Sequence, residues 1–235
     1  ERDESPTVDA LNEEWSNSAS RFLDYSAAGG RFRVIAEGPS HGEPWYGLVD
    51  EERRINLNTA PVDVLRRLVE NLGELSEVEA TEIAESIADW RDEDDDRRPL
   101  GAEASYYRSR GYECKDGPFE NVEELLLVKG MSPELYGQLE AHVSVFGSGR
   151  VNLNTATKTT LQALGLSEGA VGGLVSFRVG EDGVPGNADD RWLVSVHGVG
   201  SDLGTFVPLQ DLARLEELAR EKFVDVRSAD FRMVI

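Results

Sequence analysis

A six-residue phrase occurs twice in this chain and constrains its fold more than any other feature. Ile-Asn-Leu-Asn-Thr-Ala at 55–60 returns as Val-Asn-Leu-Asn-Thr-Ala at 151–156. Each copy opens with an extended apolar pair, continues with Asn and Thr that can cap a helix, and runs into leucines at helical spacing. The two copies therefore predict two related helical hairpins.

The charge of the chain limits its partners. Its 235 residues include 45 Asp and Glu against 24 Lys and Arg, a formal net charge of -21. Such a surface repels phosphate backbones and anionic lipid and suits cations or basic partners, although a merely solubilising surface is the plainer interpretation. Cys114 is the one cysteine, so no intrachain disulfide can form, and we expect it to fill space. No apolar run approaches the ~18 residues of a membrane span.

Strand patterns lie at both ends of the chain and helix patterns fill its middle. A helical spacing over 7–28 precedes alternating residues at 31–37 and 45–50, and the alternation returns at 223–227 and 229–235. The expected fold is α+β, with an N-terminal helix and a small antiparallel sheet that a large all-helical insertion interrupts. Helices are expected in the middle and near the end of the chain at 61–71, 76–91, 103–109, 120–127, 132–143, 156–164 and 167–179, with another starting at Pro208.

These patterns also predict the domain boundaries. Residues 1–55 form the first part of the sheet domain, residues 56–205 the inserted helical domain, and residues 206–235 the returning helix and last strands. A domain can be inserted where the flanking strands already pair, because the ends of the insertion then lie close together.

An acidic loop is the first candidate metal site. Asp92, Asp94 and Asp96 are spaced two apart, and Glu103 lies eleven residues beyond Asp92. These are positions 1, 3, 5 and 12 of an EF-hand calcium loop, although Arg97 stands where that loop has its glycine. Hard oxygen ligands favour Ca²⁺ over transition metals. The alternative is a solvated acidic loop, whose repulsion salt would screen.

A second acidic loop covers residues 181–190. Its Asp182, Asn187, Asp189 and Asp190 can converge around one cation, with backbone carbonyls completing the shell. An acidic surface turn fits the same residues equally well. The two loops together predict one or two bound Ca²⁺ ions.

The sequence indicates neither catalytic nor cofactor-binding residues. His41, His142 and His197 are scattered among different elements, and neither a nucleophile elbow nor a phosphate-cradling glycine loop occurs. We therefore expect no enzyme. A metal-dependent hydrolase that uses the clustered carboxylates stays open as an alternative, because sequence does not show an open coordination position.

Several motifs, taken in their order along the chain, resemble a known family. They are Asn-Glu-Glu-Trp at 12–15, Phe-Arg-Val at 32–34, Asp-Glu-Glu-Arg-Arg-Ile-Asn-Leu-Asn at 50–58, Asp-Trp-Arg-Asp-Glu-Asp at 89–94, Gly-Ala-Glu at 101–103, Tyr-Tyr at 106–107, Pro-Phe-Glu-Asn-Val-Glu-Glu-Leu at 118–125, Val-Lys-Gly-Met at 128–131 and the second phrase at 151–156. Together they resemble the general secretion pathway protein K family, the large minor pseudopilins of type II secretion.

This resemblance implies a pilin-like fold with a helical domain inserted between strands, calcium binding, and a place at the tip of the pseudopilus. The implied partners are the minor pseudopilins of the I and J types. The implied location is the periplasm of a Gram-negative bacterium, with a prepilin leader and a hydrophobic inner-membrane helix preceding Glu1. The acidic loop with Glu103 corresponds to the family's calcium region, and residues 181–190 resemble the calcium loop of the major pseudopilin, with Asn187 where Thr is usual.

The hairpins also resemble the helix-hairpin-helix module, and residues 128–135 resemble its turn. DNA-binding versions hold a phosphate with backbone N–H groups and nearby Lys or Arg. The corresponding turns at 71–76 and 164–169 bring carboxylates instead. The expected function is therefore non-enzymatic capping of the pseudopilus tip in support of protein export across the outer membrane, without a nucleic-acid partner. A DNA-binding protein of the competence type is the alternative.

Overall fold

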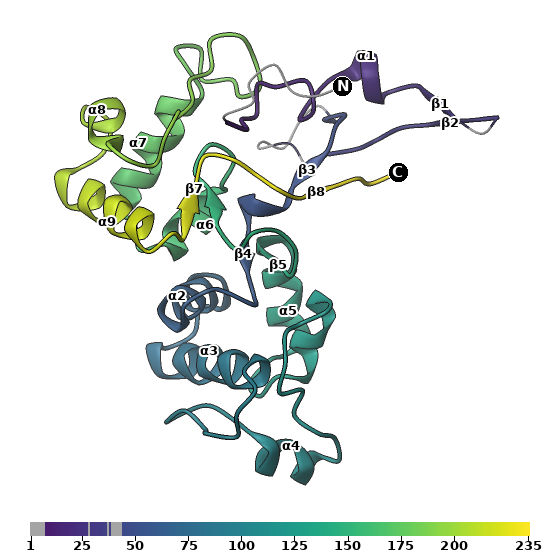
Figure 1. Cartoon of the computed structure of the whole chain (residues 1–235), viewed down its shortest axis with the longest axis vertical. Coiled ribbons are helices and arrows are strands. Elements are labelled where there is room, and N and C mark those ends of the chain that lie inside the picture. The colour runs from purple at the N-terminus through teal and green to yellow at the C-terminus, as the bar shows by residue number, and fades with distance from the viewer. Residues whose placement is uncertain (1–7, 28, 37, 39–43) are drawn as a thin grey trace. The chain divides into compact units, whose positions relative to one another are not determined.

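The fold is that of a computed structural model, which describes residues 8–27, 29–36, 38 and 44–235 (Figure 1). The chain forms two compact units. Unit 1 consists of Glu1–Arg53, Arg150–Lys158 and Leu166–Ile235, and unit 2 of Arg54–Gly149 and Thr159–Gly165. Among the described residues, no helix combines the length and the apolar character needed to cross a membrane.

Unit 2 is mainly helical. Its elements are β4 (Ile55–Asn56), α2 (Val62–Gly73), α3 (Glu77–Arg91), α4 (Ala104–Arg110), the 3-10 helix η2 (Val122–Leu127), α5 (Pro133–Leu139), the 3-10 helix η3 (Glu140–His142), β5 (Val143–Ser144) and all but the first residue of α6 (Lys158–Ala163). Helix α2 packs against both α3 and α5 (Figure 1). Ser76 and Glu79 close a capping box at the start of α3, where each side chain satisfies an exposed N–H.

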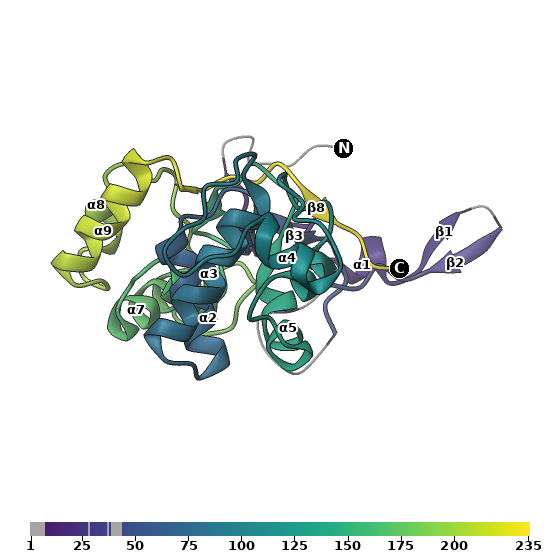
Figure 2. The ribbon, with the colours of Figure 1, turned by 90° about the horizontal axis from the view of Figure 1, so that it is seen from below.

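Unit 1 combines short strands with helices. Its elements are α1 (Ala19–Phe22), β1 (Tyr25–Ala27), β2 (Gly30–Phe32), β3 (Val49–Asp50), the 3-10 helix η1 (Glu51–Arg53), β6 (Val151–Asn152), α7 (Glu168–Arg178), α8 (Val199–Leu203), α9 (Leu209–Arg220), β7 (Val224–Asp225) and β8 (Phe231–Arg232). Helices α8 and α9 lie side by side (Figure 2). The helices expected from the sequence are confirmed to within a few residues, except the first.

The helix expected over 7–28 is wrong for the described part of that range, where only the four residues of α1 are helical. Polar side chains bond the backbone locally instead. The Glu13 carboxylate accepts from the Ala10 N–H at 3.1 Å and from the Trp15 Nε1–H at 2.7 Å. Such bonds compete with the helical ladder. Residues 7 and 28 lie outside the described residues.

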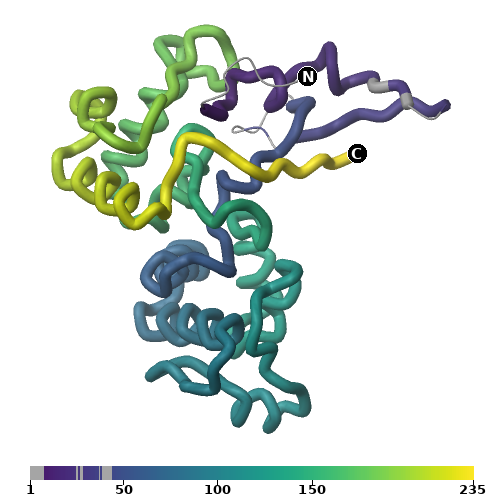
Figure 3. Tube along the Cα trace, in the orientation of Figure 1, coloured from purple at the N-terminus to yellow at the C-terminus, as the bar shows by residue number. Residues whose placement is uncertain are grey.

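The two end regions of the chain share one antiparallel strand pair (Figure 3). Strand β3 pairs with β8, so that Val49 faces Arg232 and Asp50 faces Phe231. The hairpin expected between 31–37 and 45–50 reduces to a single bridge between Ala36 and Trp45, because β2 pairs with β1 instead. Glu37 lies outside the described residues.

The expectation of an all-helical insertion is wrong, because strands occur inside it. Strand β4 runs parallel to β5, and β6 runs parallel to β7. The cause is the first Asn of each copy of the phrase. The Asn56 side chain accepts from the Asn58 N–H at 2.8 Å, and Asn152 accepts from the Asn154 N–H at 2.9 Å. Each phrase is therefore extended where it begins and turns only afterwards.

The second Asn of each copy forms a matched pair of bonds to a distant backbone. The Asn58 amide group donates to the Phe119 carbonyl at 3.0 Å and accepts from the Phe119 N–H at 2.7 Å. The Asn154 amide group makes the same two bonds to Leu193, at 3.0 and 2.8 Å. The two copies of the phrase are thus equivalent in structure as well as in sequence.

A buried arginine completes each copy. Arg91, at the end of α3, donates to the carbonyls of Leu57 and Ala60. Arg178, at the end of α7, donates to the carbonyls of Leu153 at 3.0 Å and Ala156 at 2.8 Å. Burial lowers the pKa of both arginines to about 10. Both therefore keep their charge at neutral pH and act as strong donors.

The two compact units do not coincide with the domains expected from the sequence. Residues 166–205 group with the terminal segments in unit 1 rather than with the rest of the expected insertion. A compact unit and an inserted domain are defined by different criteria, so the boundaries at 56 and 205 stay a prediction.

A buried polar network joins three segments of unit 1. The Asp50 carboxylate accepts from the Thr155 hydroxyl, from the Ser228 hydroxyl at 2.7 Å and from the Glu52 N–H at 2.8 Å. Burial nevertheless raises the pKa of Asp50 to about 6, because these bonds offset only part of the loss of hydration.

Replacing Arg178 tests the second copy of the repeat. The change Arg178→Met leaves two carbonyls without their donor and should lower the free energy of unfolding by about 2–4 kcal/mol. Urea denaturation followed by circular dichroism measures the loss. Arg220→Met is the matched control, because Arg220 is exposed at the end of α9 and should cost less than about 1 kcal/mol. Equal losses in both variants would contradict the structural role of Arg178.

The Asp50 carboxyl should make stability depend on pH. Its folded-state pKa of about 6 lies above the ordinary value of 3.8, so folding favours the protonated form. Its contribution is therefore greatest at low pH and is lost as pH rises from 4 to 6. The free energy of unfolding of the wild type, minus that of Asp50→Asn, should fall by roughly 3 kcal/mol between pH 4 and pH 7. If urea titrations showed the same difference between the two proteins across this pH range, the raised pKa of Asp50 would be contradicted.

Candidate metal centre

The acidic loop of unit 2 lies between the end of α3 and the start of α4. Helix α3 ends at Arg91, and Asp92 follows in an extended conformation at the C-cap. Glu103 is extended too and directly precedes α4. A helix C-terminus carries partial negative charge, so a carboxylate at the position of Asp92 is repelled by the helix it follows. The carboxylates of the loop thus lie beside a helix end that itself carries partial negative charge.

Side chains of α3 hold the loop against the helix. The Glu85 carboxylate accepts from the Leu100 N–H at 2.6 Å, and Arg98 bridges Asp89 at 2.5 Å and Asp92 at 2.6 Å. A Cβ on Gly101 would collide with the Asp89 carboxylate. Glycine is therefore needed where the returning chain passes the helix. These contacts fix the position, relative to α3, of the segment that carries Glu103.

Three of the four acids predicted in this loop come together. Asp92, Asp94 and Glu103 each offer an oxygen within 4.8 Å of the others. Glu103 is only 2% exposed, and neither of its carboxylate oxygens accepts a hydrogen bond from a nitrogen or hydroxyl donor. Asp92 Oδ1 is also buried without a donor. A buried acceptor without a partner costs about 1–3 kcal/mol.

The pKa of Glu103 reflects this environment. Burial and, to a smaller extent, the neighbouring carboxylates of Asp89, Asp92 and Asp116 together raise it to about 7. A cation between the acids would remove both causes, since it replaces lost hydration and cancels the repulsion. The donor set consists of hard carboxylate oxygens and fits Ca²⁺.

The fourth predicted residue, Asp96, lies apart from this cluster. It is exposed, and its N–H donates to Asp94 Oδ1 at 2.9 Å. Neither group of close acids found in the described residues contains it. The neighbouring Asp95 accepts from the Ala104 N–H at 3.2 Å, which connects the loop to the start of α4.

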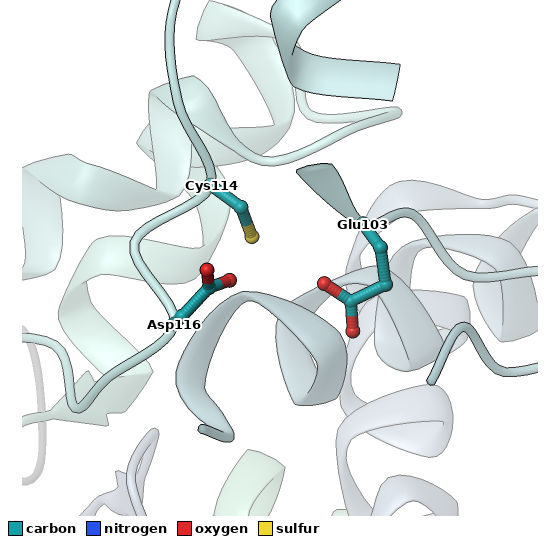
Figure 4. A group of neighbouring side chains, drawn as sticks. All are labelled: Glu103, Cys114 and Asp116. Atoms are coloured by element: carbon teal, nitrogen blue, oxygen red, sulfur yellow. The ribbon is translucent and has the colours of Figure 1, made fainter. Parts of the chain in front are cut away.

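Sequence reasoning missed a second group of neighbours around Glu103. The side chains of Glu103, Cys114 and Asp116 point toward one another, with one ligand atom from each within 4.8 Å of the others (Figure 4). Burial raises the pKa of the Cys114 thiol, which therefore stays protonated at neutral pH. Asp116 precedes Gly117 and has a φ of 49°, so this pair has the features of an ordinary turn. Because an Asp-Gly pair is typical of a turn, Asp116 was not predicted as a further carboxylate beside Glu103.

The second predicted loop, residues 181–190, bonds to itself. Asp189 Oδ2 accepts from the N–H groups of Glu181 at 2.7 Å and Asp182 at 3.3 Å, and Asn187 Nδ2 donates to Asp182 Oδ2 at 2.9 Å. These bonds connect Asp182, Asn187 and Asp189 to one another across the loop. The bond from Glu181 is the main cause that lowers the pKa of Asp189.

Asp190 has a different environment from the rest of this loop. Its Oδ2 accepts from the Gly186 N–H at 2.7 Å, whereas its Oδ1 is buried without a donor. Burial raises the pKa of Asp190. No three acids of this loop belong to the close groups found in the described residues. The second ion therefore stays a prediction.

Comparison with known proteins gives consistent matches. Residues 47–148 match the family model described as type II secretion system (T2SS), protein K. The type II secretion system protein K of Klebsiella pneumoniae is 29% identical over 171 residues, which are 66% of this chain and 47% of the relative. The protein of the same name from Aeromonas hydrophila is 33% identical over 100 residues, 40% of this chain and 30% of the relative.

The fold has a solved counterpart. A chain in the crystal structure of the GspK-GspI-GspJ complex from the enterotoxigenic Escherichia coli type 2 secretion system superposes with a TM-score of 0.70 at 23% identity. The match covers 96% of this chain and 75% of that chain. The present chain spans about half the length of the Klebsiella relative. By its matched region and its named relatives, the chain is similar to the type II secretion system protein K family.

Proposed function

We propose that this chain is part of a non-enzymatic minor pseudopilin that caps the tip of the type II secretion pseudopilus. It would act in the periplasm, assembled with minor pseudopilins of the I and J types, and support protein export across the outer membrane. The match of residues 47–148 to the protein K family model is the single observation that carries the proposal. The likeness of its fold to a chain of the GspK-GspI-GspJ complex supports it.

Exposed apolar side chains at the end of the chain suit this role. Ile35, Met233, Val234 and Ile235 are 45, 54, 43 and 73% exposed, and Ile35 bridges Val234. A group of exposed apolar residues beside a short strand is typical of a protein interaction site. We assign this group to contact with a companion pseudopilin.

The repeated helix pairs fit a packing role better than DNA binding. We interpret α2–α3 and α6–α7 as helix-hairpin-helix-like pairs. The turn of the first pair carries Glu74, and that of the second leads into Glu168, where a phosphate-binding turn needs cations. The net charge of -21 adds repulsion of any nucleic-acid backbone.

Calcium is the proposed partner of the acidic cluster. Asp92, Asp94 and Glu103 would hold the ion, with Asp116 as a further candidate ligand. The support is the buried Glu103 carboxylate, whose oxygens accept no hydrogen bond from a nitrogen or hydroxyl donor and which an ion would satisfy. Residues 181–190 would hold a second ion. Bound calcium would fix the acidic loop and so preserve the shape of the cap.

Calcium should raise the melting temperature through Glu103. At 100 times its Kd a bound ion adds about 2.7 kcal/mol, which shifts the Tm of a chain of this size by about 5–10 °C. Differential scanning fluorimetry with Ca²⁺ and with EDTA measures this shift. Titration calorimetry should find one ion fewer in Glu103→Gln than in the wild type. Glu93→Gln is the matched control, since Glu93 is exposed in the same loop. Unchanged stoichiometry in Glu103→Gln would contradict the site.

The apolar group around Val234 should be needed for the complex. The wild type should co-purify with the ectodomains of the I and J types. Val234→Asp places a charge in the contact and should weaken capture at least about tenfold, equivalent to 1.4 kcal/mol. Val78→Asp, at an equally apolar position that is 65% exposed on α3, should leave capture unchanged. Capture that is equally strong with Val234→Asp would refute this contact, and no capture of the wild type would refute the proposed assembly.

A further inference from the structure

A pocket of about 450 Å³ lies within unit 1, whereas the acidic cluster belongs to unit 2. Its walls come from the segment 194–197, the end of α9 and the β7 segment, and they include Arg150, Val194, His197, Lys222, Val224 and Arg227. This volume falls in the range of about 300–1,000 Å³ that is typical of ligand pockets. The proposed assembly role leaves this pocket without a use.

The pocket has the opposite charge to the molecule as a whole. Three cations, Arg150, Lys222 and Arg227, line it against one carboxylate, Asp225. Arg150 pairs with that carboxylate at 2.9 Å. Within the described part of the chain, no ion pair involves Lys222 or Arg227, and both side chains belong to exposed residues. Two positive charges therefore remain available in a chain whose net charge is -21.

The backbone presents one of these cations in an unusual conformation. Lys222 follows α9 with a φ of 59°, a left-handed conformation that costs a residue with a side chain about 1–2 kcal/mol. The Phe223 N–H donates to the Leu218 carbonyl at 2.9 Å and closes the helix end. The position of Lys222 is thus set by a closed helix cap rather than by a free loop.

Part of the remaining wall of the pocket is apolar. Val194, Val196, Val224 and Val226 line it, and Val194 is 66% exposed whereas the other three are buried, so that Val194 offers most of the apolar surface. A small hydrated anion such as phosphate gains nothing from this valine. A peptide that carries both carboxylates and apolar side chains gains from Val194 and the cations together. The combination therefore selects a peptide over a free anion.

We propose that this pocket binds a short acidic and apolar peptide segment of a partner protein. Carboxylates of the segment pair with Lys222 and Arg227, and an apolar side chain of the segment contacts the exposed Val194. The cations accelerate the encounter and select the charge of the segment, while the contact with Val194 buries apolar area. This interaction goes beyond pseudopilus assembly and does not depend on it.

Fluorescence anisotropy with a defined probe tests the proposal. The probe is a fluorescein-labelled, C-terminally amidated Glu-Val-Glu-Val-Glu peptide, and its partner is the whole chain without pseudopilins. We expect saturable binding that weakens with sodium chloride and at least about tenfold weaker binding for Lys222→Glu and for Arg227→Glu. Lys158→Glu is the matched control, since Lys158 is exposed outside the pocket and its replacement changes the net charge equally. It should bind as the wild type does.

Three outcomes would overturn the proposal. The first is equal binding of a Gln-Val-Gln-Val-Gln probe, which lacks the charges. The second is unchanged binding in Lys222→Glu and Arg227→Glu while circular dichroism shows both variants folded. The third is displacement by inorganic phosphate beyond that by sodium chloride at equal ionic strength, which would make the pocket a site for small anions. None of these results depends on companion pseudopilins, so the assembly role is tested separately.

Discussion

One interaction underlies both halves of the repeat: a buried guanidinium that donates to two backbone carbonyls of the Asn-Leu-Asn-Thr-Ala phrase. Arg91 makes it for the first copy and Arg178 for the second. The phrase cannot satisfy these carbonyls within a helix, because it turns there. An arginine at the end of the second helix after the phrase, α3 or α7, satisfies them and thereby positions that helix. For α3, this position also determines where the acidic loop begins.

Cations of unit 2 pair with several of its acids but not with Glu103. Arg98 bridges Asp89 and Asp92, and Lys129 pairs with Glu82 while its Nζ also donates to the Leu100 carbonyl. Glu103 has no such partner, although it is among the most buried carboxylates of the chain. We therefore place the proposed ion beside Glu103, a buried carboxylate that no cation among the described residues neutralises. In the pocket of unit 1 the imbalance is reversed, since three cations line it against the single carboxylate of Asp225.

Sequence reasoning succeeded where a pattern was local. Helices α2 and α9 follow from leucine spacing after a Pro, α3 and α7 begin after a Ser, and three acids of one short loop come together. It failed over 7–28, where short-range bonds of Glu13 compete with the helical ladder. It also failed where distant segments meet, since Asp116 meets Glu103 only after the chain has passed around α4.

The pairing of β3 with β8 has a consequence for how this chain reaches its native state. Asp50 obtains its hydroxyl donors from Thr155 and Ser228, and its strand partner from Phe231. A chain that emerges with its N-terminus first leaves Asp50 without its Ser228 donor and its Phe231 strand partner until residues 228–231 arrive. Contacts between such distant residues form slowly, because a long loop must close before any of them forms. Closure of β3 on β8 is thus a late event, and a protein that stops before Ser228 would lack the means to complete it.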